Sequence, residues 1–173
     1  LAQKNNVPTI NSFFNKETIK NLKDYLGNTD LICASNVICH IPNLNELIET
    51  IDLLLTKDGT FVFEEPYLGS MFEKVSYDQI YDEHIYIFSA SSISKIFKRF
   101  NFELIDIIPQ TTHGGSMRYV IKRSKNEIST NVEKILNYEI KKKLDKLESC
   151  INFKEDCEKS KNNIYNCSGD KGV

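Results

Sequence analysis

Short apolar runs alternate with helical patterns in the first part of the chain, and this alternation restricts the fold more than any other feature. Apolar residues recur at helical spacing in residues 15–27 and 43–55. Continuous apolar runs at 30–38 and 60–66 predict two buried strands, with a turn at 57–59 before the second. The order helix, strand, helix, strand predicts an α/β fold in which a parallel sheet carries helices on both faces.

The middle of the chain adds one more helix and two closely spaced strands. Ser89 is placed to cap a helix over 90–101. The runs at 102–109 and 116–124 predict strands joined by the glycine-containing turn at 111–115. So short a connection favours an antiparallel pair at one edge of the sheet.

Composition and charge restrict the partners. The chain has 173 residues, 40% of them hydrophobic and 27% charged, which is typical of a globular protein. A formal net charge of -2 provides no basic field for nucleic acid. No apolar run reaches the roughly 18–20 residues that span a bilayer, and the first residues lack a signal-peptide pattern. We therefore expect a cytoplasmic protein that binds neither nucleic acid nor membrane.

Cysteine spacing gives no sign of a metal site. The five cysteines stand at positions 33, 39, 150, 157 and 167, and no two of them are separated by two residues as in a zinc knuckle or redox motif. Cys33 and Cys39 lie in an apolar stretch, which favours buried, reduced thiols. The sequence therefore predicts no metal ligands.

Two unusual stretches follow the first two predicted strands. In open α/β sheets, ligands bind beyond the carboxyl ends of the strands. That rule points to "ASNVICH" at 34–40 and to the segment that runs from "EEPYLGS" to "YDEH" at 81–84. His40 and His84 are therefore expected at the same rim of the sheet.

The stretch "YDEH" brings proton-bearing side chains together. His84 suits proton transfer near neutral pH, a neighbouring carboxylate such as Glu83 can orient it, and the Tyr81 hydroxyl can donate to a developing oxyanion. The alternative is a solvated acidic loop whose aromatic rings pack on the core. Sequence alone leaves both interpretations open.

A second polar turn contains two adjacent glycines. In "HGGSMR", the turn His113–Gly114–Gly115 lets backbone N–H groups approach an anion, and Arg118 follows closely. A tight turn between strands is the alternative interpretation. The glycine-rich phosphate-binding pattern of dinucleotide-binding folds does not occur among the seven glycines of the chain.

Four stretches together resemble a known enzyme family. They are "DLICASNVICHIPNL", "DGTFVFEEPYLGSMFEKVSYDQIYDEHIYIFSASSI", "FELIDI" and "HGGSMRYVI". In this order and spacing they resemble the S-adenosylmethionine-dependent sugar C-methyltransferases, over roughly residues 7 to 145. The resemblance implies a Rossmann-like sheet and transfer of a methyl group from S-adenosylmethionine. The acceptor would be the carbon next to the keto group of a nucleotide-linked deoxysugar, attacked through a base-generated enolate.

The resemblance also implies residue roles. His84 corresponds to the catalytic base, Tyr81 and Glu83 to residues that support it, and His40 to a second active-site histidine. The loop that lines the S-adenosylmethionine site corresponds to Ala34, Ser35 and Asn36. The family's turn for contact with the sugar nucleotide corresponds to His113, Gly114, Gly115 and Arg118.

The same resemblance implies a domain division. Residues 1–125 would be the C-terminal half of the methyltransferase domain. Residues 126–173 would hold a long linking helix, from 127 to about 163, and the start of the family's C-terminal α/β domain. The family's glycine loop and its zinc-binding N-terminal region would precede Leu1, so we expect the chain by itself to be inactive.

Two other functions stay open at this stage. One is a methyltransferase that acts on another small molecule, since the same residue types can serve a hydroxyl acceptor. The other is a non-catalytic α/β binding module whose tyrosine-rich loop is an interaction surface. Binding of S-adenosylmethionine distinguishes the enzymes from the binding module.

Overall fold

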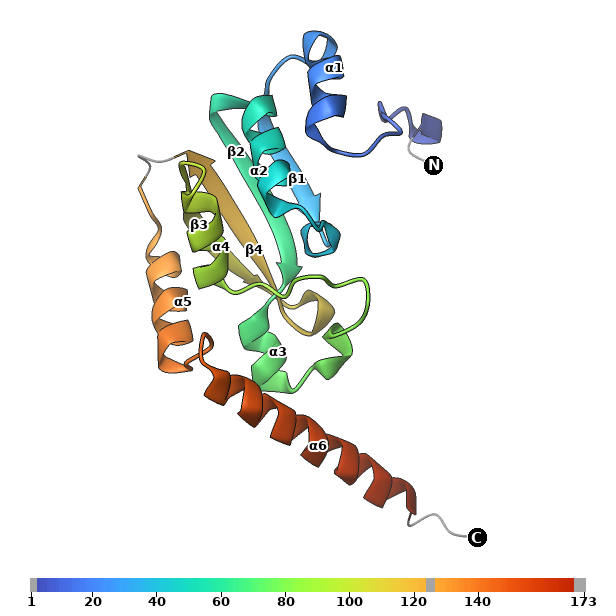
Figure 1. The fold of residues 1–173 in the computed structure, drawn as a ribbon, viewed down its shortest axis with the longest axis vertical. Helices are drawn as coiled ribbons and strands as arrows, with labels where there is room; N and C mark the ends of the chain where they lie inside the picture. The colour runs from blue at the N-terminus through green and yellow to red at the C-terminus, as the bar shows by residue number, and fades with distance from the viewer. Residues whose placement is uncertain (1–2, 124–126, 170–173) are drawn as a thin grey trace.

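The computed structural model describes residues 3–123 and 127–169, and its centre is a four-stranded mixed sheet (Figure 1). The strands are β1 (Thr29–Ser35), β2 (Leu55–Pro66), β3 (Phe102–Gln110) and β4 (Ser116–Arg123). They lie in the order β1-β2-β4-β3. β1 pairs with β2 in parallel, whereas β4 is antiparallel to both β2 and β3. The predicted α/β fold is confirmed.

The predicted antiparallel pair is confirmed, and β3 is the strand at the sheet edge. β4 turns back after residues 111–115 and inserts between β2 and β3. Pattern analysis gave the two strands and their short turn, but the order within the sheet depends on contacts with β2. Because β4 runs against both neighbours, β3 and β2 point the same way.

Helices and 3-10 turns connect and cover the strands. The α-helices are α1 (Lys16–Leu26), α2 (Leu44–Leu54), α3 (Leu68–Lys74), α4 (Ala90–Lys98), α5 (Thr130–Lys141) and α6 (Leu147–Gly169). Short 3-10 turns occupy Gln3–Asn5, Ile38–His40, Tyr77–Gln79 and Thr112–Gly114. Side-chain caps start several helices: Asn15 accepts from the Thr18 amide, Asn43 from that of Glu46, and Ser89 from that of Ser92.

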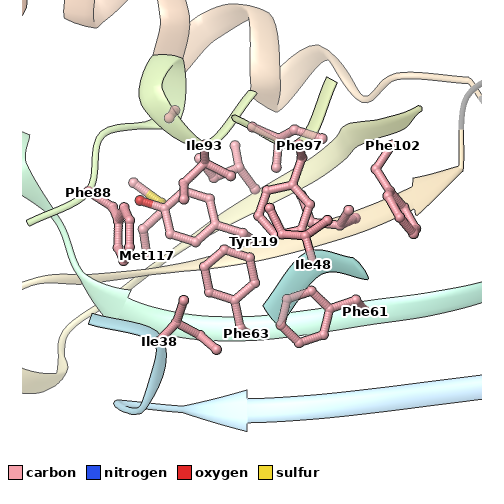
Figure 2. Close-up of a cluster of buried hydrophobic side chains, with 14 of the residues drawn as sticks. Ile38, Ile48, Phe61, Phe63, Phe88, Ile93, Phe97, Phe102, Met117 and Tyr119 are labelled. Atoms are coloured by element: carbon pink, nitrogen blue, oxygen red, sulfur yellow. The ribbon is translucent and has the colours of Figure 1, made fainter. Parts of the chain in front are cut away.

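The core lies between one face of the sheet and three helices. Phe61 and Phe63 of β2 point to this face, and Phe63 stacks on Tyr119 of β4 with ring centroids 4.9 Å apart (Figure 2). The helices contribute Ile48 from α2, Phe97 from α4 and Val132 from α5. Burying each such side chain stabilises the fold by roughly 1.5–3 kcal/mol.

The opposite face of the sheet is only partly buried. Val62 and Val120 alternate with the core residues of β2 and β4 and are half-buried. Among the described residues, the helices in the core cluster all pack on the other face. We predicted helices on both faces of the sheet, but in the described residues the core helices pack on one face only.

The predicted turn at 57–59 is wrong, because β2 continues through these residues. Leu55 pairs with Thr29, and the next pair joins Thr60 to Leu31. Four residues of β2 thus bulge out against a single residue of β1. Residues 57–59 have a sequence typical of a turn, but in the structure they form part of a bulge within β2.

The single long helix predicted after residue 127 is in fact two helices. α5 ends at Lys141, Lys143 adopts a positive φ of 54°, and α6 starts at Leu147. The break buries Leu144. α6 then extends away from the sheet (Figure 1), with Phe153 stacked on Phe72 of α3 at 4.7 Å. The predicted domain boundary near residue 125 falls beside the undescribed residues 124–126.

Candidate active site

Two segments meet at the carboxyl ends of β1 and β2. The first follows β1 and includes the 3-10 turn Ile38–His40. The second, residues 77–88, connects α3 to α4 and is called the tyrosine–histidine loop below (Figure 1). The backbone amides of Ile85 and Tyr86 both donate to the carbonyl of Cys39, at 3.0 and 3.3 Å. The expectation that His40 and His84 share one rim is therefore confirmed in space.

Aromatic side chains hold the tyrosine–histidine loop against the fold. The Tyr86 hydroxyl donates to the Pro42 carbonyl at 2.7 Å, and the Tyr86 ring stacks near Phe88 at 5.8 Å. Phe88 is only 2% exposed and bridges to Tyr67. Tyr77, in contrast, is exposed. The loop is thus fixed at its second half, next to His84.

The buried carboxylate of Glu65 fixes the segment that carries His40. Its Oε1 accepts from the backbone amides of Val37 and Ile38, at 2.9 and 2.6 Å, and the residue is fully buried. Charge-assisted bonds of this kind are among the stronger hydrogen bonds in proteins. Sequence analysis did not identify this role. The signal was the pair of acids placed directly before Pro66 at the end of a strand.

His40 is oriented by a backbone carbonyl of the tyrosine–histidine loop. Its Nδ1 lies 2.7 Å from the carbonyl oxygen of Glu83. A carbonyl only accepts, so the Nδ1 atom carries the hydrogen. In neutral His40 the Nε2 atom then keeps a free lone pair.

His84 is oriented in the same way. Its Nδ1 lies 2.8 Å from the carbonyl oxygen of Gln79, and its Nε2 lies 2.9 Å from the Tyr81 hydroxyl. With the hydrogen on Nδ1, the Tyr81 hydroxyl donates to the Nε2 lone pair. The rings of His40 and His84 have centroids 5.0 Å apart. Two imidazoles thus offer basic Nε2 atoms in one place.

The expected role of the Glu83 carboxylate stays a prediction. Its side chain is exposed, and hydrogen bonds with Gln79 and Tyr81 hold His84. The backbone carbonyl of Glu83 holds His40.

Cys39 lies beside both histidines. The residue is 1% exposed, and one ligand atom each of Cys39, His40 and His84 lies within 4.8 Å of the others. Burial, helped by the nearby Glu65 carboxylate, raises the pKa of the Cys39 thiol to about 12. The thiol is therefore protonated at neutral pH. Cys33, which was also expected to be buried, is exposed on β1.

Of the predicted cofactor-loop residues, only Asn36 follows β1; Ala34 and Ser35 are the last two residues of the strand, so their placement in a loop was wrong. Asn36 has a positive φ of 52°, which turns the chain over the end of the sheet, and its amide donates to the Glu64 carbonyl at 2.9 Å. The Asn36 side chain donates to the Ser35 hydroxyl, while Ala34 packs against the core. Polar groups at the carboxyl end of a parallel strand fit one wall of a nucleotide-like ligand.

The predicted substrate turn, residues 111–118, is called the glycine turn below. His113, Gly114 and Gly115 all have positive φ values, of 50°, 76° and 128°. At Gly115, an added Cβ would lie 2.5 Å from the Cβ of Ser70. The turn therefore needs glycine for backbone conformation and for close packing on α3.

Polar groups of the glycine turn donate hydrogen bonds to Glu64. Arg118 donates to Glu64 Oε2 at 2.9 Å, and the Thr112 hydroxyl donates to Oε1 at 2.8 Å. Partial burial acts to raise the pKa of Glu64, but these bonds outweigh it and hold that pKa below its ordinary value. In this structure Arg118 thus forms an ion pair with Glu64 of β2.

A cavity of about 260 Å³ lies elsewhere, between α3, α5 and α6. Tyr138, Lys142 and Phe153 are among its lining residues, which include no predicted site residue.

Along residues 3–123 and 127–169, no helix combines the length and apolar character that crossing a bilayer requires.

Solved structures of low similarity include methyltransferases. A SAM-dependent methyltransferase from Anabaena variabilis is 19% identical and has a TM-score of 0.46, covering 64% of this chain and 55% of its own. The PH0226 protein from Pyrococcus horikoshii is 13% identical, also with a TM-score of 0.46, over 71% and 63%.

Family models and one curated relative give a more specific result. C-methyltransferase NovU from Streptomyces niveus is 29% identical over 117 residues, which are 68% of this chain and 28% of that protein. The chain thus matches little more than a quarter of that relative's length. A methyltransferase domain model matches residues 2–107, more than half of the chain, and a C-methyltransferase C-terminal domain model matches residues 111–170. The mixed sheet therefore lies in a methyltransferase domain, and the chain belongs to the methyltransferase-domain family, with a second part that matches the C-methyltransferase C-terminal domain.

Proposed function

We propose that the complete protein transfers a methyl group from S-adenosylmethionine to a carbon next to the keto group of a nucleotide-linked deoxysugar. The observation that carries the proposal is the orientation of His84, whose Nδ1 hydrogen is held by the Gln79 carbonyl. The lone pair is thereby on Nε2, where it accepts from the Tyr81 hydroxyl, and it can take a proton once that hydroxyl turns away. The match to C-methyltransferase NovU favours carbon over oxygen as the methyl acceptor.

His84 acts as the base in this proposal. Its Nε2 removes a proton from the carbon beside the carbonyl, and the electron pair moves to the oxygen as an enolate. The Tyr81 hydroxyl, 2.9 Å from that Nε2, is the donor nearest to the reacting atoms. His40 can donate from Nε2 only when it is protonated, because its Nδ1 hydrogen is used by Glu83.

The loop Ala34–Ser35–Asn36 would hold part of S-adenosylmethionine, which supplies a methyl group on a positively charged sulfur. The enolate carbon takes that methyl group, the sulfur keeps the electron pair of the broken bond, and the carbonyl re-forms. Holding both substrates at one rim would provide much of the rate acceleration. The glycine turn would contact the sugar nucleotide.

Solvent deuterium exchange tests the role of His84. In D2O, the complete protein with a keto-sugar nucleotide should exchange the hydrogen beside the carbonyl. His84→Ala should slow this exchange by about 10²–10⁴-fold, the usual contribution of a general base. Tyr77→Phe, in the same loop but exposed, is the matched control and should exchange at the normal rate.

Two results would contradict the proposal. Full-rate exchange by the His84→Ala protein would remove His84 as the base. Methyl transfer to the sugar without any exchange, with the product methylated on oxygen, would instead identify an O-methyltransferase.

A further inference from the structure

The fold brings His84 next to Cys39 and His40, which are adjacent in the sequence. Cys39 and His40 follow β1, and His84 lies in the tyrosine–histidine loop, yet one ligand atom of each lies within 4.8 Å of the other two. Tetrahedral zinc sites with nitrogen and sulfur ligands place the donor atoms roughly 3.3–3.6 Å apart. A closure of about 1 Å between the three donor atoms would therefore complete a three-ligand site.

Both histidines already have the partners that metal-bound histidines need. The Nδ1 hydrogens of His40 and His84 are held by the carbonyls of Glu83 and Gln79, at 2.7 and 2.8 Å. Such contacts on the far nitrogen fix the tautomer and the direction of a ligating ring. The Nε2 atoms are thus the ones left for a cation.

The third ligand is held by the backbone that joins the two segments. The Cys39 carbonyl accepts from the amides of Ile85 and Tyr86, so Cys39 is tied to the stretch that follows His84. A thiolate with two imidazoles selects zinc-like cations over Mg²⁺ or Ca²⁺, which prefer oxygen ligands. On coordination the thiol proton leaves to solvent.

We propose that Cys39, His40 and His84 form a binding site for a zinc-like divalent cation, with the fourth position open. The bound cation would displace the Tyr81 hydroxyl from His84 Nε2 and would bind the lone pair of that nitrogen. It would therefore block the proton transfer assigned to His84. The blocking effect rests on the proposed function, whereas the binding site does not.

Cobalt substitution tests the site, because a thiolate bound to Co²⁺ gives a charge-transfer band. The complete protein should be titrated with Co²⁺, and Cys39→Ala compared with Cys33→Ala, a matched change at an exposed cysteine of β1. The family resemblance implies another zinc site in the complete protein, so the difference between the two variants is the informative signal. Cys33→Ala should keep the full band, and Cys39→Ala should lose one equivalent of it. Equal bands in both variants would overturn the site.

A second measurement covers the case in which Cys39→Ala does not fold. Competition with a zinc-binding dye should show that His40→Ala and His84→Ala each weaken Zn²⁺ by at least about tenfold, since even indirect partners of a metal ligand contribute 10–100-fold. Unchanged affinity in either variant would also overturn the site.

Activity separates the blocking effect from the site itself. Stoichiometric Zn²⁺ should stop deuterium exchange, and a chelator should restore it. Binding of Zn²⁺ with exchange unaffected would contradict the blocking role alone. Exchange that survives in His84→Ala would contradict the proposed function and leave the metal site standing.

Discussion

The tyrosine–histidine loop and the glycine turn were both predicted to contribute to the site, but their polar groups are used in opposite ways. In the loop, backbone carbonyls hold the Nδ1 atoms of His40 and His84, so that the lone pair of each neutral ring is on Nε2. In the glycine turn, Arg118 is paired with Glu64, at 2.9 Å. The first arrangement orients two imidazole rings, and the second fixes a turn.

Two consecutive acids of β2 support these two regions. Because side chains alternate along a strand, Glu65 points to the core and holds the backbone before His40, whereas Glu64 faces the glycine turn. Glu65 is fully buried, and Glu64 is half-buried. The same residue type should therefore have a large effect at one position and a small effect at the other.

The largest expected effect comes from Glu65. Glu65→Ala leaves the amides of Val37 and Ile38 without their acceptor, at a loss of about 1.5 kcal/mol for each charge-assisted bond. We expect the free energy of unfolding in urea to fall by about 3 kcal/mol. Glu65→Gln keeps one oxygen acceptor and should lose about half as much. A comparable loss in Glu64→Ala would break the comparison between the two acids.

The next effect tests whether the glycine turn is structural. Gly115→Ala places a Cβ against Ser70 in a backbone conformation that L residues rarely adopt, and should cost about 2–3 kcal/mol of unfolding free energy. Gly114→Ala, whose nearest atom is Ser76 Oγ at 3.5 Å, should cost about 1–2 kcal/mol for its positive φ alone. If the two variants unfold alike, close packing on α3 is not what requires glycine.

Local pattern predicted the elements, while long-range pairing decided their arrangement. The helices over 15–27 and 43–55 follow from apolar spacing, and Ser89 caps α4 as expected. The order of β4 and β3 and the bulge at 57–59 were not foreseen, because both depend on the strand that pairs alongside. A turn pattern is a local preference, and sheet pairing overrides it.

The location of the two histidines could be predicted from the sequence, but the hydrogen bonds that orient them could not. The rule that ligands bind at the carboxyl ends of strands brought His40 and His84 to one rim, where the structure has them. The carbonyls of Gln79 and Glu83 that orient them are backbone groups, which carry no residue-specific signal. Cys39 was considered only for cysteine spacing, so its approach to His84 across the fold was missed.

Two tyrosines of the tyrosine–histidine loop, Tyr81 and Tyr86, should differ in their effect on the reaction. If the Tyr81 hydroxyl donates to the enolate oxygen as proposed, Tyr81→Phe removes a transition-state hydrogen bond of about 1 kcal/mol, or about fivefold in rate. We expect about fivefold slower deuterium exchange with little change in the free energy of unfolding, because the Tyr81 side chain is exposed. Tyr86→Phe removes the bond to the Pro42 carbonyl instead, and should lower the free energy of unfolding with normal exchange. Equal exchange rates in the two variants would make Tyr81 a structural residue only.

The smallest effect is the pH dependence of the Glu64–Arg118 pair. Bonds from Thr112 and Arg118 hold the folded-state pKa of Glu64 below its ordinary value, so the pair stabilises the protein above that ordinary value. This contribution is lost as the pH falls through the lowered folded-state pKa. Arg118 is 42% exposed, so solvent screening limits the effect to about 0.5 kcal/mol.

Glu64→Gln isolates this contribution. Unfolding free energies of the native protein and Glu64→Gln should differ at about pH 6. The difference should shrink as the pH falls through the lowered folded-state pKa of Glu64. A difference that persists at low pH would mean that Glu64 acts through its shape and not its charge. The glycine turn would then be held by packing alone, and Arg118 would be free to bind an anionic substrate without a loss of stability.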